Sequence, residues 1–449
     1  MISEESYRTR SLAALPGGDA VRRILASAVR SVDPGEAVRR RVSVGEDGVL
    51  NVSGESFDLA SFRKIAVLGI GKAAVGMSAA LAETLGDRLS EGLAVTKHLP
   101  PAAVLPFPVI EGGHPVPDGR SVAAGSKVLG FLSGLGREDL LFCLISGGGS
   151  ALMAAPAEGV SLADLQSMTT ELLACGASID EINSLRRRLD LLKGGGLAIR
   201  SNGAAVVSLL LSDVMGDALE TIASGPTAPD PGFRSSALSV VSKYSLEKRL
   251  PAPLLRALET SPETPKPGDR LFDRVRNLVV GNNRIAAEAA LDRARAEGFR
   301  ASVLPAGLRG EARDAGFALA RLLSERTDSG SGGAPPECLV AGGETTVTIR
   351  GGGKGGRNTE LALAAAIGLE GRSRAILVSL ATDGEDGPTD AAGAVATGDT
   401  CRRAAELGFD AAGHLERNDS YAFFNGLDDL IKTGPSGTNV NDLVFLFRY

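Results

Sequence analysis

Short apolar runs that end in glycine-rich or polar loops recur along this chain of 449 residues, with helical patterns between them. The run KIAVLG at 64–69 ends in glycine, and LLFCLIS at 140–146 leads into three consecutive glycines. Apolar residues at helical spacing follow, at 72–86 and at 161–175. Strands that alternate with helices form parallel βαβ units whose helices cover both faces of a sheet. The sequence therefore predicts an α/β fold.

The α/β pattern is interrupted over residues 227–270, where proline, serine and glutamate are frequent. This composition predicts an extended connection, so we expect one domain over 1–240 and a second over 270–449. A polar turn near the C-terminus favours an arrangement in which residues 418–447 pack back on the first domain. The alternating run TTVTIR at 345–350 predicts a half-exposed strand.

The charge balance argues against a nucleic-acid-binding protein. Forty-eight basic and 54 acidic residues give a net charge of −6. The one basic run, RRR at 186–188, is expected to be a solvated helix face, with contact to an anion as the alternative. No apolar run approaches the roughly 20 residues that span a bilayer, so we expect no membrane segment.

The cysteines and histidines limit the chemistry further. Four cysteines lie far apart without a CxxC pair, which indicates reduced core thiols and a cytoplasmic protein. Three histidines are too few for a multi-histidine metal site. Any metal site should therefore use carboxylates.

Five polar or glycine-rich clusters follow predicted strands, where ligands bind in open α/β sheets. They are GIGKAAVG (69–76), SGGGSALM (146–153), LSDVMGD (211–217), GGET (342–345) with GGGKGGRN (351–358), and TDGEDGPTD (382–390).

The first cluster does not match a nicotinamide site. Its glycines have GxGxxxxG spacing, and Thr96 and Lys97 stand where an acidic residue would hold a ribose. Lys72 follows Gly71 at the start of a predicted helix, where a cation opposes the helix dipole. A bound phosphate or carboxylate would explain this lysine, although an ordinary surface lysine is the alternative.

Two further clusters are candidate anion-binding loops. Consecutive glycines let backbone N–H groups close around an anion, and the first such loop comprises Ser146, Gly147, Gly148, Gly149 and Ser150. A tight turn or a flexible loop remains the alternative. In the second loop, Arg357 offers a two-point fork to phosphate or carboxylate. The chain has no GxxxxGK[ST] motif, which excludes a P-loop enzyme.

The last cluster is acidic. Asp383, Glu385 and Asp386 offer hard oxygen ligands for Mg²⁺, whereas a hairpin turn or a solvated loop is the alternative. Asp213 also follows an apolar strand and is a candidate proton acceptor, or else the cap of a helix starting near Val214. Cations, glycine-rich loops and strand-end carboxylates are the groups that phosphoryl transfer requires.

In this order, the clusters resemble those of the class II glycerate 2-kinase family, whose second half is the MOFRL domain. The similarity covers nearly the whole chain. The matching stretches are GIGKAAVGM (69–77), EGGHPVPD (111–118), LISGGGSALM (144–153), LKGGGLA (192–198), LLLSDVMGDALETIASGPT (209–227), AGGETTVTIRGGGKGGRNTELALAAA (341–366), ATDGEDGPTDAAGA (381–394) and GPSGTNVNDLVF (434–445).

The resemblance implies a larger Rossmann-like domain and a smaller α/β domain, with substrates meeting in the cleft between them. It implies that ATP and a divalent cation, Mg²⁺ or another, convert D-glycerate to 2-phosphoglycerate. A homodimer is one expected assembly, and small molecules are the expected partners. The family's critical residues fall on Lys72, Arg357, Glu344, Asp213 and Asp383. We add Lys193, Asn283 and Asn441 to the expected substrate- and nucleotide-binding residues.

One departure from the family pattern is visible. This chain reads RRRLDLLKGG at 186–195 where the family has a pattern like RKHLSxIKGG, so Arg188 and Asp190 replace a histidine and a serine. The rival enzyme is an NAD(P)H-dependent hydroxypyruvate reductase. The loop at 69–76 argues against it, because its glycine spacing does not match a nicotinamide site. The non-enzymatic rival, a sugar-phosphate-sensing regulator, would need a basic DNA-binding module, and none is evident.

Overall fold

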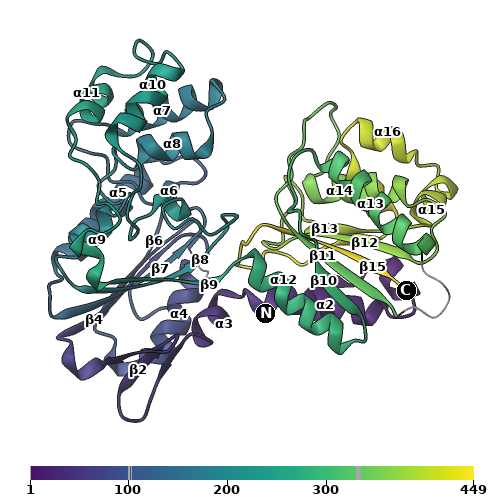
Figure 1. Cartoon of the computed structure of the whole chain (residues 1–449), viewed down its shortest axis with the longest axis horizontal. Coiled ribbons are helices and arrows are strands. Elements are labelled where there is room, and N and C mark those ends of the chain that lie inside the picture. Colours follow the sequence, from purple (N-terminus) through teal and green to yellow (C-terminus); the bar gives the residue numbers. More distant parts are fainter. Residues whose placement is uncertain (1, 100–101, 103, 330–334) are drawn as a thin grey trace. The chain divides into compact units, whose positions relative to one another are not determined.

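The computed structural model describes residues 2–99, 102, 104–329 and 335–449. The chain forms two compact units (Figure 1). The first comprises residues 1–33 and 281–449, and the second comprises residues 34–280. The sequence-based domain limits of 1–240 and 270–449 stay a prediction. The observed grouping differs from them, because residues 1–33 group with 281–449 and the other unit extends to residue 280.

The second unit is built on a six-stranded sheet with the strand order β6-β5-β4-β7-β8-β9. The four pairs from β6 to β8 are all parallel, as the βαβ pattern predicts. The strands are β4 (Lys64–Ile70), β5 (Glu91–Thr96), β6 (Val109–Glu111), β7 (Asp139–Ser146), β8 (Ala205–Leu211) and β9 (Val275–Gly281). Every residue of β7 is buried, which is typical of a central parallel strand.

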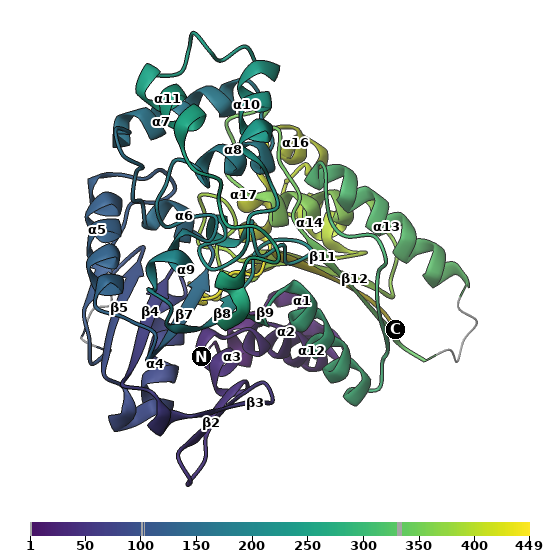
Figure 2. The same cartoon turned by 60° about the vertical axis from the view of Figure 1, so that its left-hand side comes forward.

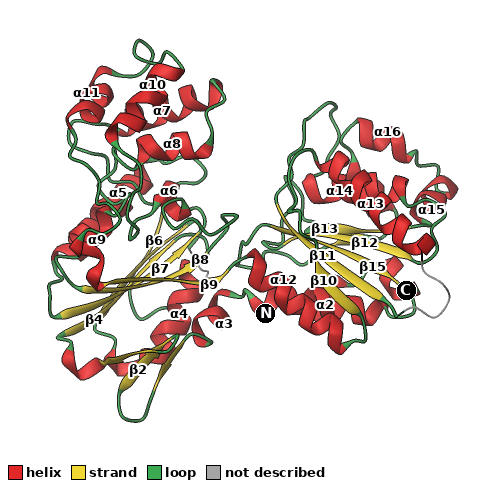
Figure 3. Ribbon diagram, in the orientation of Figure 1, coloured by secondary structure: helices red, strands yellow, loops and turns green. Residues whose placement is uncertain are grey.

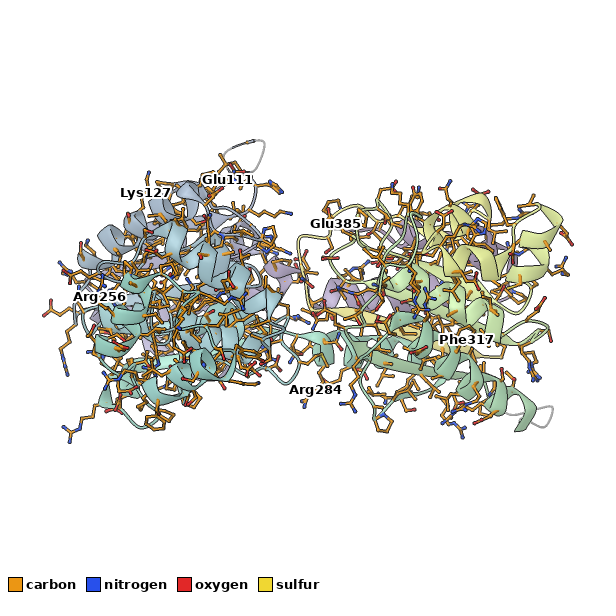
Figure 4. All side chains as sticks on the ribbon, turned by 90° about the horizontal axis from the view of Figure 1, so that it is seen from above. Glu111, Lys127, Arg256, Arg284, Phe317 and Glu385 are labelled. Atoms are coloured by element: carbon orange, nitrogen blue, oxygen red, sulfur yellow. The ribbon has the colours of Figure 1, made fainter. Side chains whose placement is uncertain are left out.

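Helices cover both faces of this sheet (Figure 3). They include α4 (Ala74–Leu85), α5 (Gly119–Ser133), α6 (Gly149–Leu152) and α9 (Gly196–Arg200), and α3 (Pro34–Arg39) packs against α4. Asp118 caps α5 by accepting hydrogen bonds from the backbone N–H groups of Arg120 and Ser121. Lys127 on α5 and Arg256 on another helix extend outward from this unit (Figure 4).

Four helices pack together around an apolar core of their own. They are α7 (Leu162–Ala174), α8 (Ile179–Arg186), α10 (Arg234–Lys243) and α11 (Ala252–Thr260). The prediction of an extended connection over 227–270 is therefore wrong, because two helices form there. Buried leucines such as Leu254 and Leu258 recur at the i, i+4 spacing of a helix between the proline-rich turns. The proline-rich composition of the segment favoured a loop and obscured this short helical pattern.

A small antiparallel sheet was not predicted. It contains β1 (Val42–Val44), β2 (Val49–Val52) and β3 (Glu55–Asp58) in sequence order. Each strand is only three or four residues long, which leaves little alternation for a pattern to reveal.

The first unit contains a mixed six-stranded sheet with the order β10-β11-β15-β12-β13-β14. Among the strand pairs that the structure describes in this sheet, β10 and β11 are parallel and the other four pairs are antiparallel. The strands are β10 (Arg300–Val303), β11 (Glu337–Gly343), β12 (Ala375–Ala381), β13 (Gly393–Thr397), β14 (Leu430–Ile431) and β15 (Asp442–Arg448). The C-terminal strand β15 lies between β11 and β12, so it forms the centre of this sheet.

Helices also flank the six-stranded sheet of the first unit. Its long helices are α2 (Gly18–Ser31), α12 (Asn283–Ala296), α13 (Ala312–Ser329) and α14 (Arg357–Gly368). Shorter ones are α1 (Arg10–Ala14), α15 (Thr400–Glu406), α16 (Ala411–Glu416) and α17 (Ser420–Gly426). Helices α2 and α12 lie side by side although they are far apart in the sequence (Figure 1, Figure 2). Arg23 on α2 reinforces this packing through two hydrogen bonds to Glu297, of 2.7 and 2.6 Å.

The predicted strand at 345–350 is wrong. Only Thr346 forms an isolated bridge there, to Glu311, and Ile349 is largely exposed. Thr345 is buried and Val347 packs against the core of this unit, so the alternation matches the burial at the start of the segment, but the backbone pairs only at Thr346. In the part of the chain that the structure describes, no helix is both long and apolar enough to cross a bilayer.

Candidate active-site residues

Three of the predicted loops meet at the carboxyl ends of β4, β7 and β8 in the second unit. The Lys72 N–H donates to the Gly147 carbonyl at 3.0 Å, and the Ala73 N–H donates to Ser146 Oγ at 3.0 Å. A β-carbon added at Gly147 would overlap the Asp213 carboxylate. The loop that contains Lys72 (69–76), the loop of residues 146–150 (the SGGGS loop) and Asp213 are therefore adjacent, as expected for loops that follow neighbouring parallel strands.

Lys72 and His114 lie against the same glycine. A β-carbon at Gly148 would sit 3.3 Å from Lys72 Cγ and 3.1 Å from His114 Cδ2. Burial, together with the positive charge of Lys72 and then Lys97, lowers the pKa of His114 to about 4. His114 is thus a neutral imidazole at neutral pH. The half-buried Lys72 ammonium makes no ion pair with any residue that the structure describes.

Asp213 is half-buried. In the described chain, no helix starts at the residues that directly follow it. The turn there is closed by Ser212, whose hydroxyl accepts a hydrogen bond from the Val214 N–H at 3.2 Å. The alternative role of Asp213 as the cap of a helix starting near Val214 is therefore wrong. Its carboxylate lies beside Gly147, in the loop between β7 and α6.

A cavity of about 190 Å³ opens beside the SGGGS loop, within the second unit. Its walls come from the loop after β6, the SGGGS loop, α7 and the end of α8. They are formed by His114, Pro115, Pro117, Gly148, Ser150, Ala151, Ala154, Leu165, Met168, Thr169, Arg186, Asp190 and Lys193. The volume is below the roughly 300–1,000 Å³ of sites for drug-sized ligands, so the cavity fits a small molecule.

Two predicted binding residues lie in this cavity in different settings. Ser150 Oγ is 2.9 Å from Ser224 Oγ, which in turn donates to Asn183 Oδ1 at 3.1 Å. Lys193 is almost fully buried, with Nζ 2.5 Å from Asp190 Oδ2. Asp190, at the position where the chain departs from the family pattern, therefore neutralises Lys193.

The basic run 186–188 is not a solvated helix face, and that prediction is wrong for two of its members. Arg187 and Arg188 are 8% and 5% exposed. Arg187 Nε lies 3.0 Å from Asp230, and Arg188 Nη2 lies 3.0 Å from Glu263. These carboxylates are 40 or more positions away in the sequence, so no local pattern indicated the pairs. A run of like charges can be buried when each charge has a partner.

In the first unit, Arg357 begins α14 and binds two acidic residues. Its Nε and Nη2 donate to the Asp442 carboxylate at 2.5 and 3.1 Å, and its Nη1 lies 2.6 Å from Glu344 Oε1. Burial favours the neutral guanidine, but the hydrogen bonds and charge of Asp442 outweigh it and raise the pKa of Arg357. Arg357 stays charged, and its fork is occupied by protein carboxylates.

Asp386 has a structural role in the same unit. Its carboxylate accepts hydrogen bonds from the N–H groups of Asn358 and Thr359 at 2.9 and 2.8 Å, and from both of their side chains. Burial raises its pKa. A carboxylate that accepts four hydrogen bonds at the start of α14 has little capacity left for a cation.

Asp383 and Glu385 are better placed to hold Mg²⁺. Asp383 follows β12, and its Oδ1 accepts a hydrogen bond from the Glu385 N–H at 3.1 Å. Glu385 is exposed on this loop (Figure 4). Among the described residues, no group of three or more histidine, cysteine or acidic side chains could hold a metal alone. One or two carboxylates suit Mg²⁺ only if phosphate oxygens complete its shell.

Asn283 and Asn441 organise the turn before β15. Asn283 Nδ2 donates to the Val440 and Asp442 carbonyls, both at 2.9 Å. The Asn441 carbonyl accepts from Thr382 Oγ1 at 2.6 Å, and Asn441 itself has a φ of 67°. These bonds hold Asp442, the partner of Arg357, at the start of β15.

Two family models match this chain. The family described as domain of unknown function (DUF4147) matches residues 20–259, and the MOFRL family matches residues 337–442. A protein of Pyrococcus horikoshii named glycerate 2-kinase is 39% identical, over 94% of this chain and 95% of its own length. The chain belongs to the class II glycerate 2-kinase family.

Other members of this family match comparably well. The D-glycerate 2-kinase of Thermotoga maritima is 42% identical over 85% of this chain and 90% of its own length. A crystal structure of glycerate kinase from T. maritima matches with a TM-score of 0.84 at 38% identity, covering 95% of this chain and 98% of that one. A relative in Agrobacterium vitis, 37% identical over 94% of this chain and 92% of its own, bears the name putative hydroxypyruvate reductase.

The family resemblance identified by the motifs is confirmed, and so is the α/β fold class. The residues assigned from those motifs fall into two sets within this glycerate 2-kinase family member. Lys72, Asp213 and the SGGGS loop cluster in the second unit, whereas Arg357 and Glu344 pair in the first. Sequence reasoning did not select His114 or Arg186 as site residues. His114 stood in the matched motif EGGHPVPD, which was a usable signal, but Arg186 was hidden in a basic run.

Proposed function

We propose that this chain transfers the γ-phosphoryl group of ATP to the 2-hydroxyl of D-glycerate. The hydroxyl oxygen loses its proton and bonds to phosphorus while the bridging P–O bond of ATP breaks, giving 2-phosphoglycerate and ADP. The observation that carries the proposal is the kinship with two glycerate 2-kinases over 85–94% of this chain. Purified protein with ATP and D-glycerate should form ADP only when both are present.

Lys72 supports this function through its charge. Lys72 is half-buried at the carboxyl end of a parallel sheet, and its ammonium pairs with no carboxylate that the structure describes, so it can neutralise charge on the transferred phosphoryl group. The nearby imidazole of His114 is neutral, so it can hydrogen-bond to a substrate hydroxyl without adding charge. Asp213, beside Gly147, is the proposed acceptor of the hydroxyl proton.

Residues of the first unit would act on the nucleotide. Asp383 with Glu385 would hold Mg²⁺, or another divalent cation, which when bound neutralises phosphate charge. Arg357 and Glu344 are proposed to position substrate groups beside them. If both units act on the same two substrates, ligand binding should draw them together and exclude water. Small-angle scattering with D-glycerate and a non-hydrolysable ATP analogue tests this, and unchanged dimensions would count against it.

The second candidate is reduction of hydroxypyruvate with NADH or NADPH, because one relative bears that name. The end of β5 argues against it. An acidic residue at the end of this strand would bind a ribose, but Thr96 is buried there and Lys97 follows it. ATP-dependent and NADH-dependent turnover, measured on one preparation, separate the two functions.

We further propose a cytoplasmic location and a homodimer. Location is supported by ATP as co-substrate and by four cysteines that form no disulfide. Light scattering of the purified protein tests the dimer.

A further inference from the structure

Arg186, the last residue of α8, differs from the basic residues that follow it. Arg187, Arg188 and Lys193 each pair with a carboxylate, those of Asp230, Glu263 and Asp190. The Arg186 guanidinium makes no hydrogen bond or ion pair with any residue that the structure describes, although it is half-buried. Burial alone lowers its pKa, but an arginine so shifted still stays protonated at neutral pH.

This guanidinium lines the 190 Å³ cavity beside the SGGGS loop. The other titratable groups of the lining contribute no net charge, because Lys193 is neutralised by Asp190 and His114 is uncharged. Prolines and the side chains of Leu165 and Met168 supply apolar walls. Arg186 is therefore the uncompensated charge in the described lining of this cavity.

Leaving a cation partly desolvated without a partner costs free energy, and a bound anion would remove that cost. A guanidinium binds a carboxylate through two parallel hydrogen bonds, which also fixes the plane of the carboxylate. At about 190 Å³ the cavity is too small for a nucleoside triphosphate, because sites for drug-sized ligands have volumes of roughly 300 Å³ or more. Its occupant should be a small organic acid.

We propose that Arg186 binds the carboxylate of the acceptor in this cavity and so selects a hydroxy acid over a neutral polyol. This inference rests on the proposed function and assigns the acceptor subsite within it. Gly148 also lines the cavity, and Lys72 and His114 lie against that glycine. An acid held at Arg186 would therefore present its hydroxyls toward the SGGGS loop.

The test compares Arg186→Met and Arg186→Lys with the wild type. Losing a charge-assisted, two-point contact should raise the KM for D-glycerate about 10- to 100-fold in Arg186→Met. Arg186→Lys should be intermediate, since it keeps the charge without the fork. The KM for ATP should not change. Specificity for D-glycerate over glycerol, expressed as a ratio of kcat/KM, should fall by a similar factor.

Stability separates this role from a structural one. Because Arg186 has no partner among the described residues, Arg186→Met should melt at the same temperature or higher. The matched control is Arg200→Met, since burial also lowers the pKa of Arg200 but its guanidinium bonds to the Gly196 carbonyl outside the cavity. This control should leave the KM for D-glycerate unchanged.

Calorimetric titration of D-glycerate without nucleotide distinguishes failure of this inference from failure of the kinase assignment. Binding to the wild type that is lost in Arg186→Met supports the carboxylate subsite even if no phosphorylation occurs. Equal binding to both proteins, or to neither, overturns it. A raised KM for ATP with an unchanged KM for D-glycerate also overturns it, because Arg186 would then contact phosphate.

Discussion

Arg357 holds Asp442 at two points, with Nε and Nη2 donating to the two carboxylate oxygens at 2.5 and 3.1 Å. The arginine begins α14 and the aspartate begins the central strand β15, so the pair connects a helix to the sheet that it covers. Asp442 is almost fully buried. The same arginine is thus a candidate for function and a support for the fold.

The first prediction follows from this pair. Arg357→Met should destabilise the protein by about 3–5 kcal/mol, because it leaves the Asp442 carboxylate buried without its partner. Arg357→Lys should cost less but still impair turnover, since the fork is lost. Urea unfolding measures the first effect and steady-state kinetics the second. The exposed Arg350→Met is the control, and equal stability of both methionine variants would contradict the prediction.

Lys72→Ala should reduce kcat by about 10²-fold or more, because it removes a preorganised charge partner of the transferred group. The melting temperature should change little, as the Lys72 ammonium pairs with no described residue. Turnover near the wild-type level in a folded Lys72→Ala protein would reject the proposed role.

Asp213→Asn should lower kcat by about 10²–10⁴-fold if this carboxylate accepts the hydroxyl proton. The fold should be retained, because Ser212 closes the adjacent turn. Kinetics and thermal melting of the same sample check both parts. If turnover stays normal, the proton acceptor must be sought at another acidic residue, Asp383 or Glu344.

Stability should depend on pH through His114. Its pKa falls from an unfolded value of 6.5 to about 4 in the folded protein, so unfolding takes up a proton between these values. Stability due to the neutral imidazole is fully present above pH 6.5 and is lost as pH falls to about 4. His114→Gln should flatten this part of the melting temperature curve. Identical slopes for variant and wild type would show that His114 titrates normally.

Activity should disappear with EDTA and return with Mg²⁺. Asp383→Asn should raise the Mg²⁺ concentration needed for half-maximal activity, because it removes a hard oxygen ligand. Asp386→Asn should instead lower the melting temperature, because Asp386 caps α14. Phosphorylation that persists without divalent cations would refute the metal role.

Much of the fold was predictable because its strands are short apolar runs followed by helices of regular period. The parallel sheet of the second unit follows this rule from β4 to β8. The position of β15 could not be predicted. A C-terminal strand that inserts between β11 and β12 has the same local sequence pattern as one that lies at the edge of a sheet. The association of α2 with α12 likewise depends on contacts between residues far apart in the sequence.

The candidate site was predictable only where a motif carries its residues. Lys72, Asp213 and Arg357 stand in matched loops, whereas Arg186 became distinct only when the partners of Arg187 and Arg188 were known. Asp386 shows the opposite case, since its sequence suggested a metal ligand but its hydrogen bonds give it a capping role. Sequence patterns locate charges, and only the fold determines which charges are neutralised.

The central claim is tested most directly by identifying the product of the wild-type protein with D-glycerate, ATP and Mg²⁺. Phosphorus and carbon NMR spectra distinguish a phosphate on carbon 2 from one on carbon 3. The account predicts 2-phosphoglycerate and ADP in equal amounts. A phosphate on carbon 3, or no phosphorylated product together with NADH-dependent consumption of hydroxypyruvate, would contradict it.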